Sequence, residues 1–464
     1  MVLGAGLVLA SCDGGNKPGK GGQGVEPDPV QLPEAQQLDS IPYNIILANP
    51  VQAQLGLHSY AYATHQGKWL LVGGRTNGFH RTSTPASTFP SATANDSLRV
   101  LNPSTGQVLS APVPESMRWR LSVTNLQFYQ EAGILFLVGG YGSTCEADYD
   151  TCYQTFPYLT AIKVPPLIAA IESQQYDQIE QNIVSIEDEA FRVTGGFMKK
   201  LGDYYYLVFG QDYFTKYQPG VSGRYTNAVS RFKISFDGTN LGISDYSVVQ
   251  DTARGDSSQY HRRDLSVVSS ILPGQKPGIT VYGGVFTPQD LAWQHPVYIS
   301  DENDGGFNVT VDTDFTQYWN LYECAHVLLY DPTVQGMYTT LLGGITYKRY
   351  GEGNEVVEDP LLPWSRTIST VVLDGTGHSF EQPQGPDVAL SMPGFMGANG
   401  FFEPNEGVAL YDAHDIIDYS QLQGDSVVLG KFYGGIKTSS IQVINRGSSV
   451  ASDMIYDVVL VKKR

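Results

Sequence analysis

The chain of 464 residues carries a formal net charge of −18, and only 16% of its residues are charged. Nucleic acids and anionic membrane surfaces repel an acidic protein, so the composition argues against a nucleic-acid-binding function. Hydrophobic residues make up 41% of the sequence, which is enough for a large core, and the length allows several domains or one repeat-built domain.

The first twelve residues, MVLGAGLVLASC, form an apolar run that ends Leu9-Ala10-Ser11-Cys12. This run resembles the lipobox of bacterial lipoproteins. The resemblance implies a signal peptide over residues 1–11, cleavage before Cys12, and acyl chains such as palmitate on the thiol and new amino group of Cys12. Because stable anchoring needs more than one acyl chain, we expect a lipid-anchored protein of the bacterial cell envelope, at the outer membrane on its periplasmic or surface side.

Gly, Pro and polar residues dominate the segment that follows Cys12. Such a segment has little apolar surface to bury, so we expect residues 12–38 to form a flexible tether. The remaining residues, 39–464, are predicted to form the folded body.

An apolar strand that ends on glycine recurs six times within this body. KWLLVGG, LFLVGG and ITVYGG are examples, and the last glycines of the six copies are Gly74, Gly140, Gly210, Gly284, Gly344 and Gly435. Another apolar strand precedes each copy, as in residues 121–129 and 264–272, and two alternating apolar–polar strands follow it. Strands that are apolar on both faces lie between packed sheets, whereas alternating strands are half exposed. The sequence therefore predicts six four-stranded units arranged radially as an all-β propeller.

A glycine pair closes the second strand of five units, and Phe209-Gly210 closes that of the third. This feature resembles the kelch propellers, the class that includes the central domain of galactose oxidase and bacterial sialate mutarotases. The resemblance covers about residues 43–464 and implies a six-bladed kelch-type β-propeller with four-stranded blades. It also implies that the loops after the glycine pairs and the loops that link the blades emerge on the same face.

Two segments fall outside the four-strand unit. Residues 165–181 begin with proline and place Leu167, Ile168 and Ile171 on one side, which predicts a helix inserted in the second blade. The last unit lacks one strand, and residues 43–49, YNIILAN, form a spare strand before the first unit. We expect this spare strand to become the outer strand of the last blade and so close the ring.

Cys145 and Cys152 lie in one polar loop, CEADYDTC. In an oxidising compartment a disulfide between them would staple this loop. A metal site is a poorer interpretation, because no histidine lies beside the pair and two thiolates do not complete a tetrahedral shell. We expect Cys324 to be a buried free thiol.

The kelch resemblance places two sets of side chains on the same face. One set follows the glycine pairs and contains Arg75, Asn77 and His80; the other opens the first strands and contains Trp119, Arg120, Arg192, Arg263, Trp319 and Glu323. Counted back from the glycines, the three arginines of the second set occupy comparable points, as do His58 and Glu323, so we expect the arginines to converge on one mouth. A cationic, aromatic-lined mouth suits a carboxylate, a phosphate or a sugar.

These observations favour one function and leave two alternatives open. The favoured function is the binding of a glycan or an envelope protein by a monomeric propeller, with no metal and no cofactor. The first alternative is a carbohydrate-active enzyme with sialate-mutarotase-like activity, in which Glu323, His58, His80 or His261 supplies the acid and the base. The second is a scaffold in an envelope complex, in which the arginines brace adjacent blades.

Overall fold

The computed structural model describes residues 34–80, 88–146, 149–218, 223–251, 257–302, 305–412, 415–442 and 448–464. The predicted signal peptide, Cys12 and most of the predicted tether lie outside the described residues. Within the described part of the chain, no helix is both long enough and apolar enough to cross a membrane.

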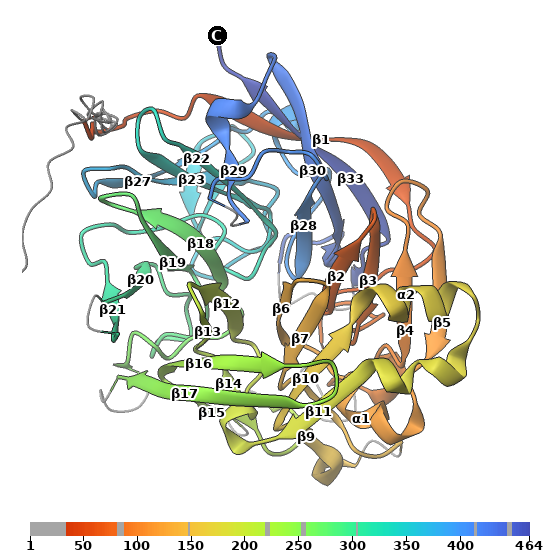
Figure 1. Cartoon of the computed structure of the whole chain (residues 1–464). Helices are drawn as coiled ribbons and strands as arrows, with labels where there is room; N and C mark the ends of the chain where they lie inside the picture. The colour runs from red at the N-terminus through yellow and green to blue at the C-terminus, as the bar shows by residue number, and fades with distance from the viewer. Residues whose placement is uncertain are drawn as a thin grey trace, which may run out of the picture.

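Six antiparallel sheets stand around a common axis and form a six-bladed β-propeller, as the sequence predicts (Figure 1). Blades 1 to 3 comprise β2 (Ala61–His65), β3 (Lys68–Val72), β4 (Ser97–Leu101) and β5 (Val108–Pro112); β6 (Gln127–Glu131), β7 (Ile134–Val138), β10 (Tyr158–Lys163) and β11 (Ile183–Glu187); and β12 (Phe197–Leu201), β13 (Tyr204–Val208), β16 (Ala228–Phe236) and β17 (Leu241–Gln250). Blades 4 to 6 comprise β18 (Ser266–Leu272), β19 (Lys276–Tyr282), β20 (Val297–Asp301) and β21 (Phe307–Val311); β22 (His326–Asp331), β23 (Gly336–Leu342), β26 (Ile368–Leu373) and β27 (Ser379–Pro383); and β28 (Gly400–Pro404), β30 (Ser426–Gly434), β33 (Met454–Lys462) and β1 (Tyr43–Gln52). In blade 5 the short strand β29 (Ile417–Asp418) also pairs with β22.

Burial falls from the axis towards the rim of the ring. In blade 3, β13 is buried from Tyr205 to Val208, whereas the outer strand β17 exposes Tyr246 and Val248. In blade 1, β3 buries its last four residues and β5 is mostly half-exposed or exposed. The inner strands therefore pack between neighbouring sheets, and the apolar surface buried there holds the blades together.

The ring closes by pairing the two ends of the described chain. β1 pairs antiparallel with the C-terminal strand β33, with Tyr43 opposite Lys462 and Leu47 opposite Val458. Tyr43 is buried, and its hydroxyl lies 2.9 Å from the Thr340 hydroxyl of blade 5. The expectation that the spare strand completes the last blade is confirmed.

The predicted helical insertion lies in blade 2 but is shorter than expected. α2 (Val164–Glu172) connects β10 to β11 and buries Leu167, Ile168 and Ile171 against the outside of blades 1 and 2. The helix ends because Gln174 adopts a φ of 57°, and only short 3₁₀ turns follow before β11.

The first strand of blade 2 is also shorter than residues 121–129. A four-residue helix, α1 (Arg118–Leu121), occupies its predicted start, and β6 begins only at Gln127. Asn125, with a φ of 52°, turns the chain into the strand. Trp119 and Arg120 consequently lie on a helix and not on an inner strand.

The glycine pairs lie where neighbouring blades touch. The second glycine of each pair, and Gly210 at the equivalent position of blade 3, has a φ between 82° and 93°. Its N–H donates to a carbonyl of the next blade: Gly74 to Val123 (2.8 Å), Gly140 to Val193 (3.0 Å), Gly210 to Arg262 (2.9 Å), Gly284 to Leu321 (2.8 Å), Gly344 to Met396 (3.0 Å) and Gly435 to Leu57 (3.0 Å). At the first glycine of five pairs, an added Cβ would lie only 1.9–2.6 Å from a carbonyl oxygen of the next blade. The repeat therefore marks a close backbone contact between blades.

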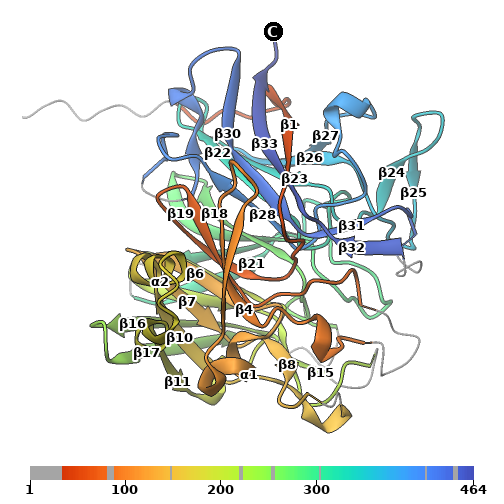
Figure 2. The same cartoon turned by 90° about the vertical axis from the view of Figure 1, so that its right-hand side faces the viewer.

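Four two-stranded ribbons project from one face of the ring, which we call the ribbon face. They are β8 (Tyr141–Ser143) with β9 (Tyr153–Thr155), β14 (Gln211–Tyr213) with β15 (Gly223–Tyr225), β24 (Lys348–Tyr350) with β25 (Val356–Glu358), and β31 (Ile436–Thr438) with β32 (Ser449–Ala451). Figure 2 shows β24, β25, β31 and β32 on the right and α2 on the opposite side of the ring.

The cysteines are paired as the sequence predicts. A disulfide joins Cys145 and Cys152, whose Cα atoms are 5.8 Å apart, and it closes the loop between β8 and β9. Cys324 is a buried free thiol.

Candidate ligand-binding site

Six residues, one from each blade, form a closed ring of backbone hydrogen bonds that we call the axial ring. Each N–H donates to the carbonyl of the equivalent residue in the preceding blade: Asn125 to Ser59 (3.1 Å), Gly195 to Asn125 (3.3 Å), Asp264 to Gly195 (2.8 Å), Glu323 to Asp264 (2.9 Å), Asn399 to Glu323 (2.9 Å) and Ser59 to Asn399 (3.4 Å). All of these except Glu323 have a φ between 50° and 67°. Gly, Asn and Asp tolerate this conformation best, which explains the small polar residues at these positions.

A pocket of about 50 Å³, the axial pocket, lies against this ring. Its lining includes every residue of the axial ring except Glu323. Its walls are aromatic and consist mainly of His80, Phe89, Tyr141, Tyr213, Tyr217 and Tyr322. Because Tyr141 and Tyr213 belong to β8 and β14, the pocket lies on the ribbon face.

The wall beside blade 1 is packed closely. The His80 ring lies 4.8 Å from both the Phe89 and the Tyr217 ring, centre to centre. The Arg75 guanidinium lies 5.1 Å from the centre of the Phe89 ring and donates to Pro90 O at 2.8 Å. Cation–π and hydrogen-bond contacts therefore hold this arginine in place.

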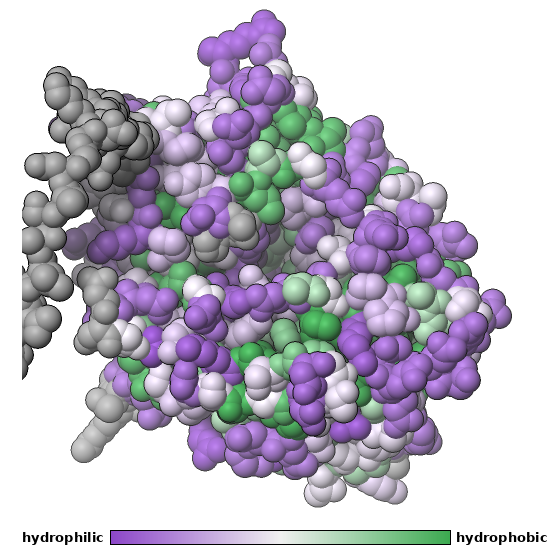
Figure 3. Space-filling model, viewed as in Figure 1, coloured by the Kyte–Doolittle hydropathy of each residue, from purple (hydrophilic) through white to green (hydrophobic). Residues whose placement is uncertain are grey.

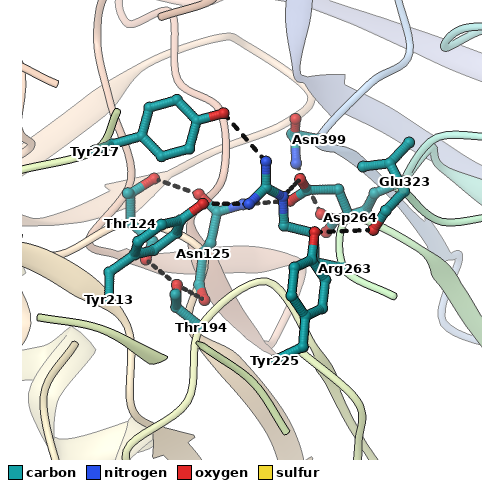
Figure 4. A network of polar contacts seen from close by, with 11 residues as sticks. Thr124, Asn125, Thr194, Tyr213, Tyr217, Tyr225, Arg263, Asp264, Glu323 and Asn399 are labelled. Atoms are coloured by element: carbon teal, nitrogen blue, oxygen red, sulfur yellow. Dashed lines mark hydrogen bonds and ion pairs between the residues drawn. The ribbon is translucent and has the colours of Figure 1, made fainter. Parts of the chain in front are cut away.

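Arg263 is the central side chain of the pocket (Figure 4). Its Nη1 donates to the Tyr213 hydroxyl, its Nη2 donates to the Tyr217 hydroxyl at 3.1 Å, and its Nε lies 3.2 Å from Asp264 Oδ2. The guanidinium carbon also lies 5.2–5.9 Å from the centres of four aromatic rings. A buried charge is tolerated here because it is both paired and hydrogen-bonded.

The two hydroxyls that hold Arg263 have unused donors. A tyrosine hydroxyl carries one proton and two lone pairs, so an oxygen that accepts from Arg263 directs its own proton elsewhere. No described residue accepts the proton of Tyr213 or of Tyr217. Burial raises the pKa of Tyr213 far above its usual value, so this hydroxyl keeps its proton at physiological pH. The pocket therefore presents two buried donors to a ligand.

Two carboxyl groups, those of Asp264 and Glu323, belong to the axial ring. Glu323 Oε2 accepts a hydrogen bond from Asn399 Nδ2 at 2.8 Å. Burial, reinforced by the negative charge of Asp264, raises the pKa of Glu323 to about 8. Burial also raises the pKa of Asp264, although Arg263 opposes this shift. Glu323 is therefore mostly neutral at pH 7, and its charge does not cancel that of Arg263.

The structure brings three of the predicted site residues into the axial pocket: Arg75, His80 and Arg263. His58 also lines the pocket, and burial together with the charge of Arg75 lowers its pKa to about 3, so its imidazole is neutral. Asn77 does not line the pocket but accepts from Arg75 Nε at 3.2 Å.

Arg120 and Arg192, which we expected to converge with Arg263, do not line the axial pocket. Arg192 Nε and Nη2 donate to the two carboxylate oxygens of Glu189 at 2.7 and 2.6 Å. Arg120 lies 5.3 Å from the centre of the Tyr158 ring. Arg192 Nη1 also donates to Thr155 O of β9 at 2.6 Å, so Arg192 contacts blade 2.

The two predicted tryptophans also lie outside the axial pocket. Trp319 is buried, with its ring 5.2 Å from that of Tyr350. Trp119 lines a neighbouring groove of about 260 Å³ together with Arg118. This groove shares Arg75, Phe89 and Tyr141 with the axial pocket, so the two cavities adjoin.

Arg120 and Arg192 are not equivalent to Arg263 because the hairpin of the two inner strands differs in length between blades. From the ring residue to the second glycine the interval is 15 residues in blades 1 to 3 (Ser59 to Gly74, Asn125 to Gly140, Gly195 to Gly210). It is 20 residues from Asp264 to Gly284 and 21 from Glu323 to Gly344, because β18, β19 and β23 are longer. Thr124 and Thr194, and not Arg120 and Arg192, are the positions equivalent to Arg263.

The sequence analysis did not identify Tyr217, Phe89 or Asp264 as site residues. The constant interval in the first three blades is a signal that could have located the axial ring. Tyr217 and Phe89 come from excursions that follow the glycine pairs, and no periodic pattern marks them.

Metal binding has no candidate in the described part of the chain, where no group of three His, Cys, Asp or Glu side chains is placed to hold an ion.

No protein-family model matches the sequence, and no curated protein matches it. Among solved structures 186 chains match. One of them, titled "Structure of YjhT", has a TM-score of 0.46 and 10% identity, covering 89% of this chain and 97% of that chain. This likeness carries no argument about fold, ligand or activity. The sheets and the pocket themselves define the class of the protein, a six-bladed β-propeller with an arginine-centred axial pocket.

Proposed function

We propose that this protein is a ligand-binding propeller of the bacterial cell envelope, and that its axial pocket binds the acidic or oxygen-rich end of a glycan. The observation that carries the proposal is the pair of Tyr213 and Tyr217 hydroxyls, which Arg263 holds and whose protons no described residue accepts. A ligand oxygen would satisfy these buried donors. Because a guanidinium polarises both hydroxyls, an anionic acceptor such as a carboxylate binds best.

The size of the pocket limits which part of a ligand enters. The axial pocket, at about 50 Å³, is smaller than the adjoining groove, at about 260 Å³, so we expect the axial pocket to take the acidic end of the ligand. The rest of the glycan would lie in the adjoining groove of about 260 Å³, where Trp119 offers an aromatic face. The ligand is thus expected to bind end-on.

The envelope location, the anchor and the kelch-type classification belong to the same proposal. Their support is the lipobox-like run before Cys12, the polar tether over residues 12–38 and the glycine pairs. The lipid would hold a monomeric propeller at the membrane, with its pocket accessible to an envelope glycan or to a glycan-bearing envelope protein. Metabolic labelling with an alkyne palmitate analogue tests the anchor: label on the wild type and none on Cys12→Ser is the expected result, and equal labelling would contradict it.

A carbohydrate-active enzyme with sialate-mutarotase-like activity is the second candidate. It is favoured by Glu323, whose pKa of about 8 keeps a carboxylic acid available as a proton donor at neutral pH. Glu323 does not line the axial pocket, however, and its carboxylate is bound by Asn399. NMR measurement of anomer exchange in N-acetylneuraminate decides this point. The binding function predicts no acceleration, whereas acceleration that Glu323→Gln abolishes would establish the enzyme.

The scaffold alternative predicts that the arginines brace adjacent blades through backbone carbonyls and carboxylates. Arg192 pairs with Glu189, three residues earlier, and Arg263 pairs with the adjacent Asp264. Neither ion pair joins two blades, but hydrogen bonds of the arginines do. Arg192 donates to Thr155 O of blade 2, and Arg263 donates to the Tyr213 and Tyr217 hydroxyls of blade 3. The observation that favours the binding function over the scaffold is the pair of unused hydroxyl protons on Tyr213 and Tyr217.

Titration with two matched sugars tests the binding function. A glycan array with the folded body from residue 38 onward identifies natural ligands, and calorimetry then compares D-glucuronate with D-glucose, which differ only at C6. We expect D-glucuronate to bind at least about tenfold tighter. Tyr213→Phe/Tyr217→Phe removes only the two hydroxyls and should weaken D-glucuronate binding about tenfold or more.

The control for this titration is Tyr246→Phe, which removes a hydroxyl from an exposed side chain on β17. It should bind D-glucuronate like the wild type. No binding on the array, or equal affinities for the wild type and the double variant, would contradict the proposal.

A further inference from the structure

A second cavity, the far chamber, lies at the other end of the propeller axis. Its volume is about 340 Å³, and it shares no lining residue with the axial pocket. Inner-strand residues line it: Tyr62, Phe128 and His326 each lie three positions beyond a residue of the axial ring, and Ala132 of the β6–β7 turn also contributes. Because the inner strands run away from the ribbon face, the far chamber opens on the opposite face. Figure 3 shows this face, which is hollowed near its centre.

Four aromatic rings from four blades form one apolar surface in the far chamber: Tyr62, Phe128, Phe197 and Phe401. The Phe401 ring lies 5.2 Å from the Tyr62 ring and 5.3 Å from the Phe128 ring, centre to centre. The Phe197 ring lies 6.2 Å from that of Phe128. Such a surface stacks against the C–H face of a sugar ring.

The polar side chains of the far chamber are fixed in place. Glu403 accepts hydrogen bonds from the Tyr62 hydroxyl at 3.1 Å and the Thr64 hydroxyl at 3.0 Å. Lys199 Nζ donates to Asp415 Oδ2 at 2.6 Å, which joins β12 to the long loop after β28. This fixed geometry is what a specific polar site requires.

The charges of the far chamber compensate one another. Lys199 and Asp415 form an ion pair, and burial raises the pKa of Glu403 to about 7. His326 Nδ1 donates to Cys324 O at 3.2 Å, and burial lowers the pKa of His326 to about 4. The imidazole is therefore neutral, with Nε2 as an acceptor. The chamber offers donors and acceptors together, without the single-sign charge that an ionic ligand needs.

We propose that the far chamber is a second binding site, for a neutral hydroxylated molecule of about one sugar ring in size. The aromatic surface takes the apolar face of the ring, and Glu403, His326 and Lys199 with Asp415 bind its hydroxyls. The cavity volume falls within the range of roughly 300–1,000 Å³ that small-molecule sites occupy. This site differs from the axial pocket in the charge, the size and the end of the axis that it uses.

Saturation-transfer NMR on the full chain tests the second site, with methyl β-D-glucopyranoside as the neutral probe. The signal should titrate to saturation in the wild type. Glu403→Leu removes the carboxyl group and should weaken binding at least about fivefold, and Thr64→Val, which removes one hydroxyl that positions Glu403, should weaken it less. Tyr246→Phe on the exposed outer strand should bind like the wild type, and thermal melting checks that each variant is folded.

The binding of the neutral probe by the two variants shows which of the two cavities holds the sugar. Loss of signal in Glu403→Leu with retention in Tyr213→Phe/Tyr217→Phe supports the far chamber. Loss in the double tyrosine variant with retention in Glu403→Leu places the sugar in the axial pocket and overturns this proposal. A wild type that gives no saturable signal also overturns it, and leaves binding of D-glucuronate in the axial pocket to its own test.

Discussion

The axial ring contains a titrating carboxyl group, Glu323, whose N–H donates to the carbonyl of Asp264, the ion-pair partner of Arg263. The pKa of Glu323 is raised to about 8 by burial and by Asp264, whereas in the unfolded chain it is about 4.3. Between these two values the unfolded chain has lost its proton and the folded protein still holds it. This group therefore lowers the stability of the fold as pH rises from about 4.5 to 8.

Replacement of the Glu323 carboxyl group should remove this loss of fold stability at higher pH. Glu323→Gln should gain stability relative to the wild type with increasing pH, by roughly 2 kcal/mol or more between pH 5 and pH 8, because one pKa unit corresponds to about 1.4 kcal/mol. Urea unfolding at several pH values measures the difference. Glu302→Gln, at an exposed position after β20, is the matched control variant. A constant difference between Glu323→Gln and the wild type would show that the carboxyl is ionised in the fold.

At the scale of the element, the glycine pair is a contact between blades as well as the end of a strand. At Gly139 an added Cβ would lie 1.9 Å from Val193 O of the next blade, and φ is 64°. At Gly67, in the β2–β3 turn, φ is 71° but nothing lies within 4 Å of an added Cβ. The two positions share the backbone strain and differ only in the contact.

Alanine substitutions at Gly67 and Gly139 separate backbone strain from the contact between blades. Gly67→Ala should lose about 1 kcal/mol of unfolding free energy through backbone strain alone. Gly139→Ala should lose about 3 kcal/mol, because the blades must also move apart. Equal losses in urea unfolding would mean that the inter-blade contact contributes nothing.

At the scale of the whole molecule, one strand closes the ring. Among the described residues, β1 is the strand that pairs with the outer edge of β33, and it brings the N-terminal end of the described chain into the last blade. Without it, blade 6 keeps three strands and exposes the buried residues Ile455, Val458 and Leu460 of β33 more fully.

Truncation tests this closure. A chain that begins at residue 53 should melt at least about 10 °C lower than one that begins at residue 34, or should fail to fold, because it loses a ten-residue strand of blade 6. Calorimetry measures the difference. Equal melting temperatures would show that the ring does not depend on β1.

The sequence predicts this architecture well because its determinants are local and repeated. A backbone contact that recurs in every blade requires glycine at Gly74 and its equivalents. The spare strand at residues 43–49 is found by counting strands. The site is predicted only in part. Arg75 and Arg263 follow from their distance to the glycines, but the partners of Arg263, Tyr213 and Tyr217, come from one ribbon excursion in blade 3. Such excursions differ in every blade, so no repeat reveals which of their side chains reach the axis.

A crystal structure of the protein with D-glucuronate tests the central claim most directly. We expect the carboxylate to lie in the axial pocket, within hydrogen-bond distance of both the Tyr213 and the Tyr217 hydroxyl and beside Arg263. Density for the sugar only elsewhere, or an axial pocket that excludes the carboxylate at saturating concentration, would contradict the assignment of the axial pocket as a ligand-binding site.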